Sequence, residues 1–342
     1  MDLTTHYLGL TLRNPLVASA SPLSVSLDRI VALANAGVGA IVLYSLFEEE
    51  VHREELRDAA IVETHENAFG EAMTYFPTTA RPGGPEPSAV SRYLKLIERA
   101  SATVTVPVIG SLNGSTEGGW TRLARSMQDA GAAAIELNIY FVPGDPHTPG
   151  RVVEDRHVEI LREVKEHVTI PVAVKLSPHF SSPGEMALRL DQAGADGLVL
   201  FNRFLHPDVD PERLSVEPGV VLSRPEDARL PRSWIAILHG HVTGSLAATT
   251  GVERGEDVAA YLLAGADVVM TASALLRHGV EHAGRILTGL ETWMSRKGFE
   301  SVDDVRGRLA VPRDTDATAY ERAGYVAALE RGRETYSSLG IR

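Results

Sequence analysis

Eight short segments rich in Val, Ile and Ala recur along the 342-residue chain, and most are followed by a segment of helical period. Near-continuous apolar strands that alternate with helices are typical of a parallel sheet whose outer face is covered. Four of the helical segments end in Ala-Gly just before the next strand, where glycine accepts the left-handed C-cap conformation. Eight such units in about 260 residues predict a (β/α)8 TIM barrel.

The predicted strands follow one another between residues 16 and 273. In order, they are "LVASA" (16–20), "AIVLYS" (40–45), "VPVIGS" (106–111), "AAIELNI" (133–139), "PVAVKLS" (171–177), "GLVLFN" (197–202), "LAATTG" (246–251) and "DVVMTAS" (267–273). The predicted helices between them include 27–36, 119–130, 153–167, 183–193 and 255–264.

Two long insertions interrupt this alternation, at 47–91 and 202–245. The first is charged and then rich in Pro and Gly, and the second contains "NRFLHPDVDPERLSVEPG". Loops of this length in a compact domain are usually functional or disordered, and loops that follow barrel strands lie on the face where active sites form. We therefore interpret both insertions as lids.

The C-terminal segment "TAYERAGYVAALERGRETYSSL" has helical spacing. It predicts an accessory helix that packs outside the barrel or against a partner. The expected organisation is one barrel domain over 1–310 and a C-terminal helical extension over 311–342.

Composition and charge limit the kinds of partner. The net charge is -12 and no basic run occurs, which argues against nucleic acid or an anionic membrane surface and favours a small-molecule substrate. The chain has no cysteine, which excludes disulfides, cysteine-ligated metal centres and thiolate catalysis. No leader-like segment and no run of about 18 apolar residues is visible, so a soluble cytoplasmic protein is expected.

Polar residues occupy the C-terminal ends of several predicted strands, where a barrel places its active site. They are Ser19, Ser45, Asn113, Asn138, Lys175 and Asn202. Lys175 is the most informative, because a lysine near the end of an apolar strand points into the barrel mouth and must meet an anion there. The alternative for Lys175 is a structural ion pair with Glu136.

The last two strands run through small residues into helix starts. Backbone N–H groups at Gly251, Ala272 and Ser273 are placed to face a common phosphate, aided by the helix dipoles. Barrels often bind a phosphate at this position, after strands seven and eight.

Several of these motifs together resemble one family. The opening "LGLTLRNPLVASASPLS" resembles the N-terminal hairpin and first strand of the dihydroorotate dehydrogenases, whose usual form runs N-P-hydrophobic-x-x-A-S-G. "IELNIYFVPG" is similar to their fourth-strand segment and "VAVKLSPHF" to their fifth. "GVERGEDVAAYLLAGADVVMTASALLRHG" resembles their closing phosphate-binding units, and "WMSRKGFESVDDVRGRL" their last helix.

The resemblance implies an FMN-binding barrel that oxidises or reduces a carbon–carbon bond beside a carbonyl, as in pyrimidine biosynthesis, and it implies a homodimer. Lys175 would lie beside the N1–C2 edge of the flavin and stabilise its reduced anion. The residues expected to bind FMN are Ala18, Ser19, Ala20, Ser45, Asn113, Asn138, Lys175, Asn202, Thr250, Gly251, Ala272 and Ser273. The residues expected to act in catalysis are Lys175, Asn138, Tyr140 and His147.

Three positions depart from the family pattern. Tyr44 stands where the family usually has a lysine, and Thr250 replaces the first glycine of the phosphate turn. The proton-removing base of the family, Cys or Ser, aligns with Phe141. A phenyl ring cannot accept a proton, and Tyr140 would do so only if its pKa of about 10 were lowered. His147 and His179 are either replacement acid/base groups or loop residues.

Three functions are therefore weighed: a redox enzyme acting on a CH–CH bond, a flavin- or phosphometabolite-binding barrel that has lost its base, and a metal-dependent hydrolase. The third uses His239 and His241, which in a strand would share one face as metal ligands do. Metal barrels usually carry such a pair on the first strand, whereas this pair precedes the seventh. Solvated or loop histidines are therefore favoured, and no metal site is expected.

Overall fold

Eight parallel strands close into a ring within the described part of the chain, which comprises residues 1–51, 88–114, 120–141, 143–203 and 207–337 of a computed structural model. The strands are β3 (Leu16–Ala18), β4 (Ala40–Val42), β6 (Val108–Gly114), β7 (Ala134–Ile139), β8 (Val172–Leu176), β9 (Gly197–Leu200), β12 (Ser245–Ala248) and β13 (Val268–Thr271). Each pairs with the next in this order, and β13 pairs with β3. The predicted (β/α)8 barrel is confirmed.

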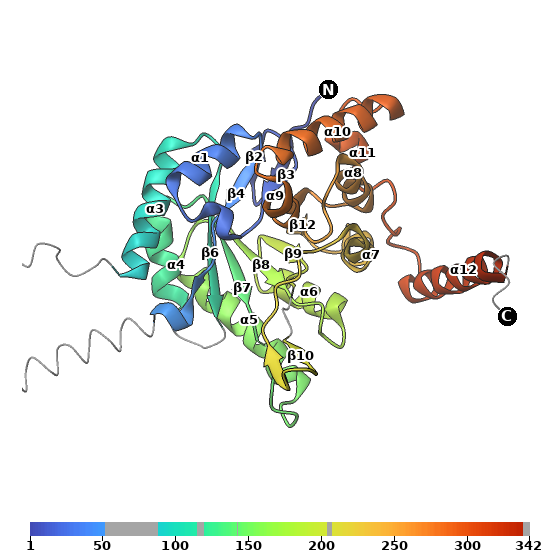
Figure 1. The fold of residues 1–342 in the computed structure, drawn as a ribbon, viewed down its shortest axis with the longest axis horizontal. Helices are drawn as coiled ribbons and strands as arrows, with labels where there is room; N and C mark the ends of the chain where they lie inside the picture. The colour runs from blue at the N-terminus through green and yellow to red at the C-terminus, as the bar shows by residue number, and fades with distance from the viewer. Residues whose placement is uncertain (52–87, 115–119, 142, 204–206, 338–342) are drawn as a thin grey trace, which may run out of the picture.

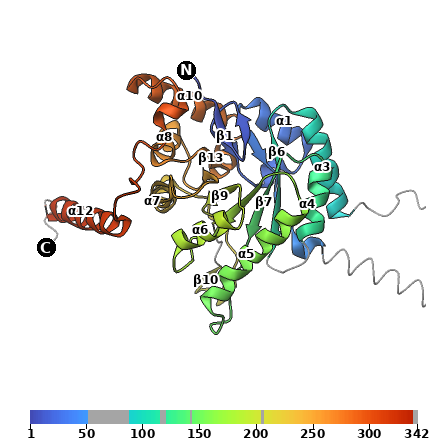
Figure 2. The ribbon, with the colours of Figure 1, turned by 180° about the vertical axis from the view of Figure 1, so that it is seen from behind.

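Helices surround the strands, as Figures 1 and 2 show from opposite sides. They are α1 (Leu27–Asn35), α3 (Ala89–Thr103), α4 (Trp120–Asp129), α5 (Gly150–His167), α6 (Pro183–Gln192), α7 (Arg229–Leu238), α8 (Gly255–Ala264), α9 (Ser273–His278), α10 (His282–Lys297), α11 (Val302–Val305) and α12 (Ala317–Ser337), with 3-10 turns η1 (Pro22–Ser24) and η2 (Pro225–Ala228). None of the described helices is both long and apolar enough to cross a membrane.

The Ala-Gly pairs end helices as the sequence predicts. After α8, Gly265 takes φ +115° and its N–H donates to the Tyr261 and Leu262 carbonyls. The glycines of the other pairs, Gly37, Gly131 and Gly194, also have positive φ. These left-handed residues stop the helix and release the chain into the next strand.

An N-terminal hairpin covers the end of the barrel where the strands begin. It pairs β1 (Thr5–Tyr7) with β2 (Leu10–Leu12), and it buries Tyr7 and Leu8 against the apolar barrel interior. The Leu8 N–H donates to Ser245 Oγ at the start of β12. Burial, and then the charges of Glu136 and Asp267, raise the pKa of Tyr7 well above its usual value, so its phenol stays neutral. A ligand site must therefore lie at the other end of the barrel.

Side-chain alternation makes the other end of the barrel polar. On β8, Ala173 belongs to the apolar interior and Lys175 follows on the same face. On β7, Ala134 is likewise interior, and Glu136 and Asn138 follow. The buried side chains of Glu136, Asn138 and Lys175 thus lie toward the C-terminal ends of these two strands.

The two insertions differ in how much of them the structure describes. Most of the first lies outside the described residues. At its start β5 (Leu46–Phe47) pairs with β6, and the strand expected at 40–45 is the shorter β4. The second forms a hairpin of β10 (Asp208–Asp210) and β11 (Ser215–Glu217), followed by η2 and α7. The lid role of both insertions stays a prediction.

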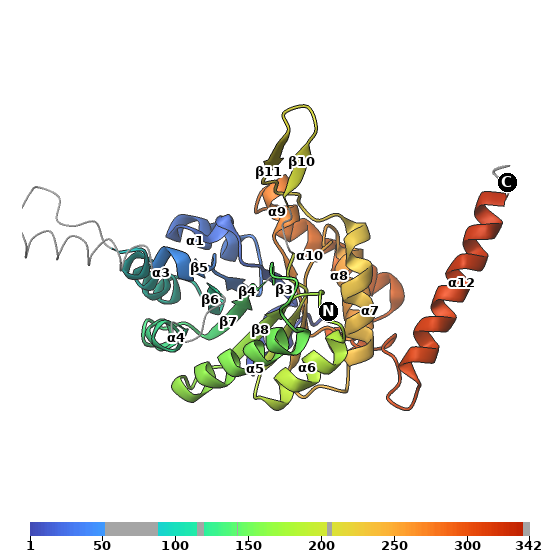
Figure 3. The same cartoon turned by 90° about the horizontal axis from the view of Figure 1, so that it is seen from below.

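The predicted C-terminal helix is present as α12, and Figure 3 shows it standing off from the barrel beyond α7. Ser233 on α7 donates to Glu321 Oε1 at 2.8 Å. Tyr320, Tyr325, Val326 and Leu329 on α12 are exposed.

Candidate functional site

A cavity of about 150 Å³ lies at the C-terminal ends of the barrel strands. Its lining residues are Ser19, Ala20, Lys175, Phe201, Asn202, Arg203, Ser223, Thr249, Thr250, Gly251, Val252, Met270, Thr271, Ala272 and Ser273. Those that the sequence singled out for cofactor binding are Ser19, Ala20, Lys175, Asn202, Thr250, Gly251, Ala272 and Ser273. Residues from five separate strand ends thus meet around one space, which we call the strand-end cavity.

Four expected cofactor residues are not among the described residues that line this cavity, and two of them, Ala18 and Ser45, are engaged in other contacts. Ala18 is buried in β3, where it pairs with Thr271 of β13. Ser45 is bonded to Ser111, with 2.8 Å between the two hydroxyl oxygens. Neither is among the described lining residues, so their cofactor role stays a prediction.

The three asparagines lie close to one another. Asn202 Nδ2 donates to Asn138 Oδ1 at 2.7 Å, which joins Asn138 to the wall of the strand-end cavity. Asn113 and Asn138 are directly paired positions on β6 and β7. Amides at these positions can donate and accept hydrogen bonds in one plane, as recognition of a carbonyl or imide edge requires.

Lys175 is the buried cation of the strand-end cavity. Its side chain is 8% exposed, and Nζ lies 3.4 Å from Ser19 Oγ and 3.5 Å from Glu136 Oε1. Glu136 is 1% exposed, and neither of its carboxylate oxygens has a hydrogen bond within the described structure. The ion pair proposed as an alternative role for Lys175 is therefore present, and the lysine also faces the cavity.

Two consecutive residues of the turn after β12 have a left-handed backbone conformation. Thr250 takes φ +82° and Gly251 φ +70°. A Cβ on Gly251 would lie 2.7 Å from the Arg224 carbonyl oxygen, so only glycine fits there. Tyr261 Oη lies 2.7 Å from the Thr250 carbonyl oxygen. Burial raises the pKa of Tyr261, which keeps its hydroxyl protonated as a donor to this strained turn.

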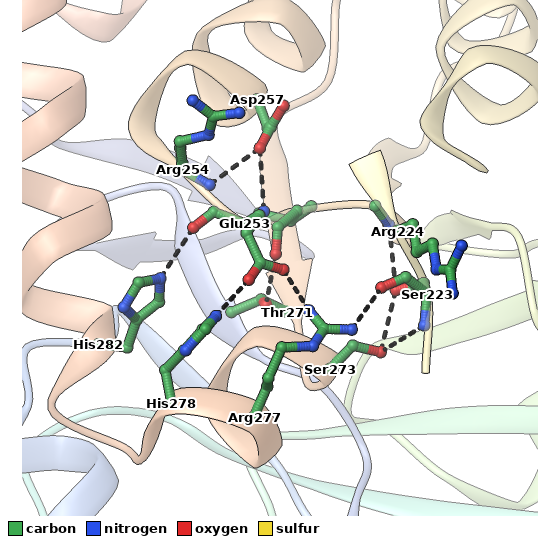
Figure 4. Close-up of polar contacts among 12 residues, drawn as sticks. Ser223, Arg224, Glu253, Arg254, Asp257, Thr271, Ser273, Arg277, His278 and His282 are labelled. Carbon is green, nitrogen blue, oxygen red and sulfur yellow. Dashed lines mark hydrogen bonds and ion pairs between the residues drawn. The ribbon is translucent and has the colours of Figure 1, made fainter. Parts of the chain in front are cut away.

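Ser223, from the second insertion, completes this end of the cavity (Figure 4). Its hydroxyl oxygen lies 3.2 Å from the Gly251 nitrogen, from which it accepts a hydrogen bond. Ser273 Oγ accepts from the Ser223 N–H at 3.0 Å and lies 2.9 Å from Ser223 Oγ. Two hydroxyls and a glycine N–H therefore face one another without any charged group between them.

A charged cluster behind this end holds Ser223 in place (Figure 4). Arg277 Nη2 donates to the Ser223 carbonyl oxygen at 3.1 Å, and its Nη1 pairs with Glu253. His278 Nε2 also contacts the Glu253 carboxylate, and His282 donates to the Glu253 carbonyl oxygen. Burial opposes ionisation of Glu253, but the hydrogen bonds from His278 and Arg277 outweigh it and hold its pKa below the usual value.

Sequence reasoning missed Ser223, Arg203 and Arg277. One signal was available, because "RPED" at 224–227 and "RGED" at 254–257 share a pattern. In both, the aspartate accepts from the backbone N–H of the arginine and caps the start of a helical turn, η2 and α8. The two capped turns flank the strand-end cavity.

Phe141 lines a second cavity of about 250 Å³, between the loops that follow β7 and β8. Arg156 Cζ lies 4.2 Å from the centroid of the Phe141 ring. His179 lines the same cavity. His147 is exposed, and its backbone N–H donates to Asp145 Oδ1. His147 and Tyr140 are not among the described lining residues of the two cavities. The acid/base roles of Tyr140, His147 and His179 stay predictions.

Tyr44, which stands in place of a lysine, packs edge-on against Tyr93 with 5.1 Å between ring centroids. Burial, and then the charge of Glu50, raise the pKa of Tyr44 above its usual value. The phenol is therefore neutral, so Tyr44 is an uncharged side chain at the position where the family usually has a lysine.

The two histidines weighed as metal ligands lie in a turn and not in a strand. α7 ends at Leu238, Gly240 takes φ +81°, and His239 and His241 lie in the turn. His239 Nδ1 bonds the Gly265 carbonyl oxygen, near the starting ends of the strands and opposite the strand-end cavity. No group of three His, Cys, Asp or Glu residues that could hold a metal occurs among the described residues.

Comparison with known proteins agrees with this geometry. A family model described as dihydroorotate dehydrogenase matches residues 83–294. The catalytic subunit of dihydroorotate dehydrogenase B (NAD(+)) from Thermoplasma acidophilum is 27% identical over 314 residues, which cover 90% of this chain and 98% of that protein. Its counterpart from Methanothermobacter thermautotrophicus is 25% identical over 318 residues, which cover 89% of this chain and 97% of that protein.

A more distant likeness extends over part of the chain. The NAD-dependent dihydropyrimidine dehydrogenase subunit PreA of Escherichia coli is 25% identical over 217 residues, which cover 58% of this chain and 52% of that protein. These relatives are all dehydrogenases by name. Because the family model matches more than half of its length, this chain belongs to the dihydroorotate dehydrogenase family.

Proposed function

We propose that this oxidoreductase binds FMN noncovalently and acts on a carbon–carbon bond beside a carbonyl group. One observation carries the proposal: the strand-end cavity joins a buried cation, Lys175, to the small-residue turns at Gly251 and at Ala272–Ser273. A flavin nucleotide needs both, a cation beside its ring and neutral donors around its phosphate.

The residues present fit the phosphate end of such a cofactor. The Gly251 N–H donates to Ser223 Oγ, which lies 2.9 Å from Ser273 Oγ, and all three residues line the cavity. Rotation of the Ser223 side chain would free these donors for a phosphate. Gly251 admits no Cβ because Arg224 and Ala228 pack against it, which holds the second insertion close to this turn. Arg277 keeps Ser223 in position from behind and would add positive potential without blocking the cavity.

When bound, FMN supplies the hydride chemistry of the reaction. Lys175 would offset the negative charge of the reduced ring, and Glu136 holds the ammonium group in place. The linked amides of Asn138 and Asn202 would orient a substrate carbonyl or imide group. These roles follow from position and chemistry at the strand ends.

Oxidation also requires that a base remove the proton on the neighbouring substrate carbon, and this step is the difficult one. Phe141 cannot take it, and the chain has no cysteine to stand in. We therefore propose that dihydroorotate is oxidised slowly if at all, and that the natural substrate differs from it. Dihydroorotate and dihydropyrimidines, the compounds in the relatives' names, are the first to be compared.

A second candidate is a barrel that binds flavin without catalysis. The aromatic residue at the place of the base favours it. Anaerobic bleaching of the bound flavin by any candidate substrate would exclude it. A cytoplasmic location and a homodimer stay predictions from the sequence.

The direct test is to denature the purified protein and analyse the released small molecules by chromatography. We expect FMN in the protein as isolated or after reconstitution. Failure to retain FMN after reconstitution with an excess would refute the proposal.

A further inference from the structure

The strand-end cavity and the second cavity are each lined by a residue at the end of β8. Lys175 lines the first and Ser177 the second, and residues two apart at a strand end continue the same face. Ser177 is buried, and its hydroxyl accepts from the His179 N–H. A ligand with its reactive end beside Lys175 can therefore extend past Ser177 into the second cavity.

Two aromatic side chains form the walls of this second cavity, which we call the aromatic cavity. Phe141 comes from the loop after β7 and Phe180 from the loop after β8, and Val153 and Pro143 add further apolar surface. Each phenyl ring is positioned from behind by one of two consecutive residues of α5. Arg156 lies over Phe141, and His157 meets Phe180 edge-on, with 5.1 Å between the ring centroids.

The support behind Phe180 is rigid. His157 is 1% exposed, and its Nδ1 donates to the Val153 carbonyl oxygen at 2.6 Å. Burial lowers the pKa of His157 below its usual value, so its ring is uncharged where it meets Phe180. Both aromatic walls are thus held in place in advance, which reduces the entropy lost when a flat ligand binds between them.

The charge of the aromatic cavity is unsuited to an anion. None of the described lining residues is a lysine or an arginine, and the one carboxylate, Glu154, already lies 3.5 Å from Arg189. Ser181 donates to the other oxygen of Glu154. The carboxylate of dihydroorotate would find no cation among these residues.

We infer that the aromatic cavity binds an uncharged, flat ring of the substrate, so that the natural substrate is larger and less anionic than dihydroorotate. On this account Phe141 is a binding wall at the position where the family has a base. A dry apolar cavity of about 150 Å³ already accepts benzene, so about 250 Å³ holds a substituted six-membered ring. The link to substrate rests on the proposed function, whereas ring binding itself does not require the cofactor.

The test uses benzamide and benzoate, which share a shape and differ in charge. Each is titrated by ligand-observed NMR into the full chain, with and without added FMN. Benzamide should bind, and benzoate should bind at least about tenfold more weakly because it meets no cation. Absence of benzamide binding, or equal or tighter binding of benzoate, would overturn the inference.

A matched pair of substitutions locates the site. Gly150 lines the aromatic cavity and Gly144 does not, and a Cβ at either position meets nothing within 4 Å. Gly150→Leu should weaken benzamide binding at least about tenfold by filling the cavity, whereas Gly144→Leu should leave it within about twofold. Equal affinities in the two variants would place the ring elsewhere and contradict the inference.

Phe180→Ala provides a second measurement in case Gly150→Leu does not fold. Loss of one aromatic contact should weaken benzamide binding about two- to tenfold. Unchanged affinity in a folded Phe180→Ala variant would overturn the inference. FMN content is measured on the same samples. If the protein binds benzamide but retains no FMN, only the proposed function is refuted. If it retains FMN but does not bind benzamide, only this inference is refuted.

Discussion

Replacing Lys175 by methionine is expected to lower both stability and flavin affinity, through two separable effects. The first is the loss of the ion pair with Glu136, whose partner atoms lie 3.5 Å apart in a buried site. At an effective dielectric constant of about 20, unit charges at this distance attract by about 5 kcal/mol. Removing one partner of a buried pair typically lowers the free energy of unfolding by about 3 to 5 kcal/mol, and protonation of Glu136 limits this decrease.

A loss of that size should lower the melting temperature by about 5 to 8 °C for a barrel of this length. The double variant Lys175→Met, Glu136→Gln removes both charges and should recover most of this loss, since a neutral pair leaves no unpaired charge. Calorimetry on the two single variants, the double variant and the parent completes the thermodynamic cycle.

The second effect should remain in the double variant. Without the cation, FMN should bind more weakly and the reduction potential of bound flavin should fall by about 30 mV or more, where 30 mV corresponds to about 1.4 kcal/mol for a two-electron couple. Fluorescence titration gives the affinity and a redox-dye titration the potential. If the double variant matches the parent in both, Lys175 is only a structural partner of Glu136 and the reasoning is refuted.

The remaining predictions concern the missing base and the charged cluster. FMN-loaded protein should oxidise dihydroorotate about 10² to 10⁴ times more slowly than an enzyme with a placed base, and Phe141→Cys should raise the rate. Stopped-flow measurement of flavin bleaching checks both, and rapid bleaching of the parent protein's flavin by dihydroorotate would contradict the prediction. Arg277→Ala should weaken FMN binding about 5- to 30-fold by freeing Ser223, and riboflavin binding by less than about twofold. Arg285→Ala, an exposed position on α10, is the control, and equal losses for FMN and riboflavin would count against a role at the phosphate end.

The barrel was predictable because its signals are local. Apolar strands, helical spacing and Ala-Gly helix ends each depend on a few neighbouring residues, and they predicted β7, β8 and α8 closely. Lys175 could be placed at the barrel mouth from strand alternation alone. The same alternation predicted its ion pair with Glu136.

The missed features depend on contacts between distant segments. Ser223 reaches Gly251 only because Arg277 and Ser273 hold the second insertion against two βα turns. The aromatic cavity joins Phe141 to Phe180 from different loops, and no periodicity reports such a meeting. Spacing alone could not show that His239 and His241 lie in the glycine-containing turn that follows α7.

The central claim is that the strand-end cavity is a flavin nucleotide site. The most direct measurement is the FMN stoichiometry of the full chain after reconstitution, together with competition by inorganic phosphate. The account predicts about one FMN per chain, with binding weakened by phosphate because both occupy the Gly251 and Ser273 end of the cavity. A chain that retains no FMN, or that binds it with no sensitivity to phosphate, would contradict the account.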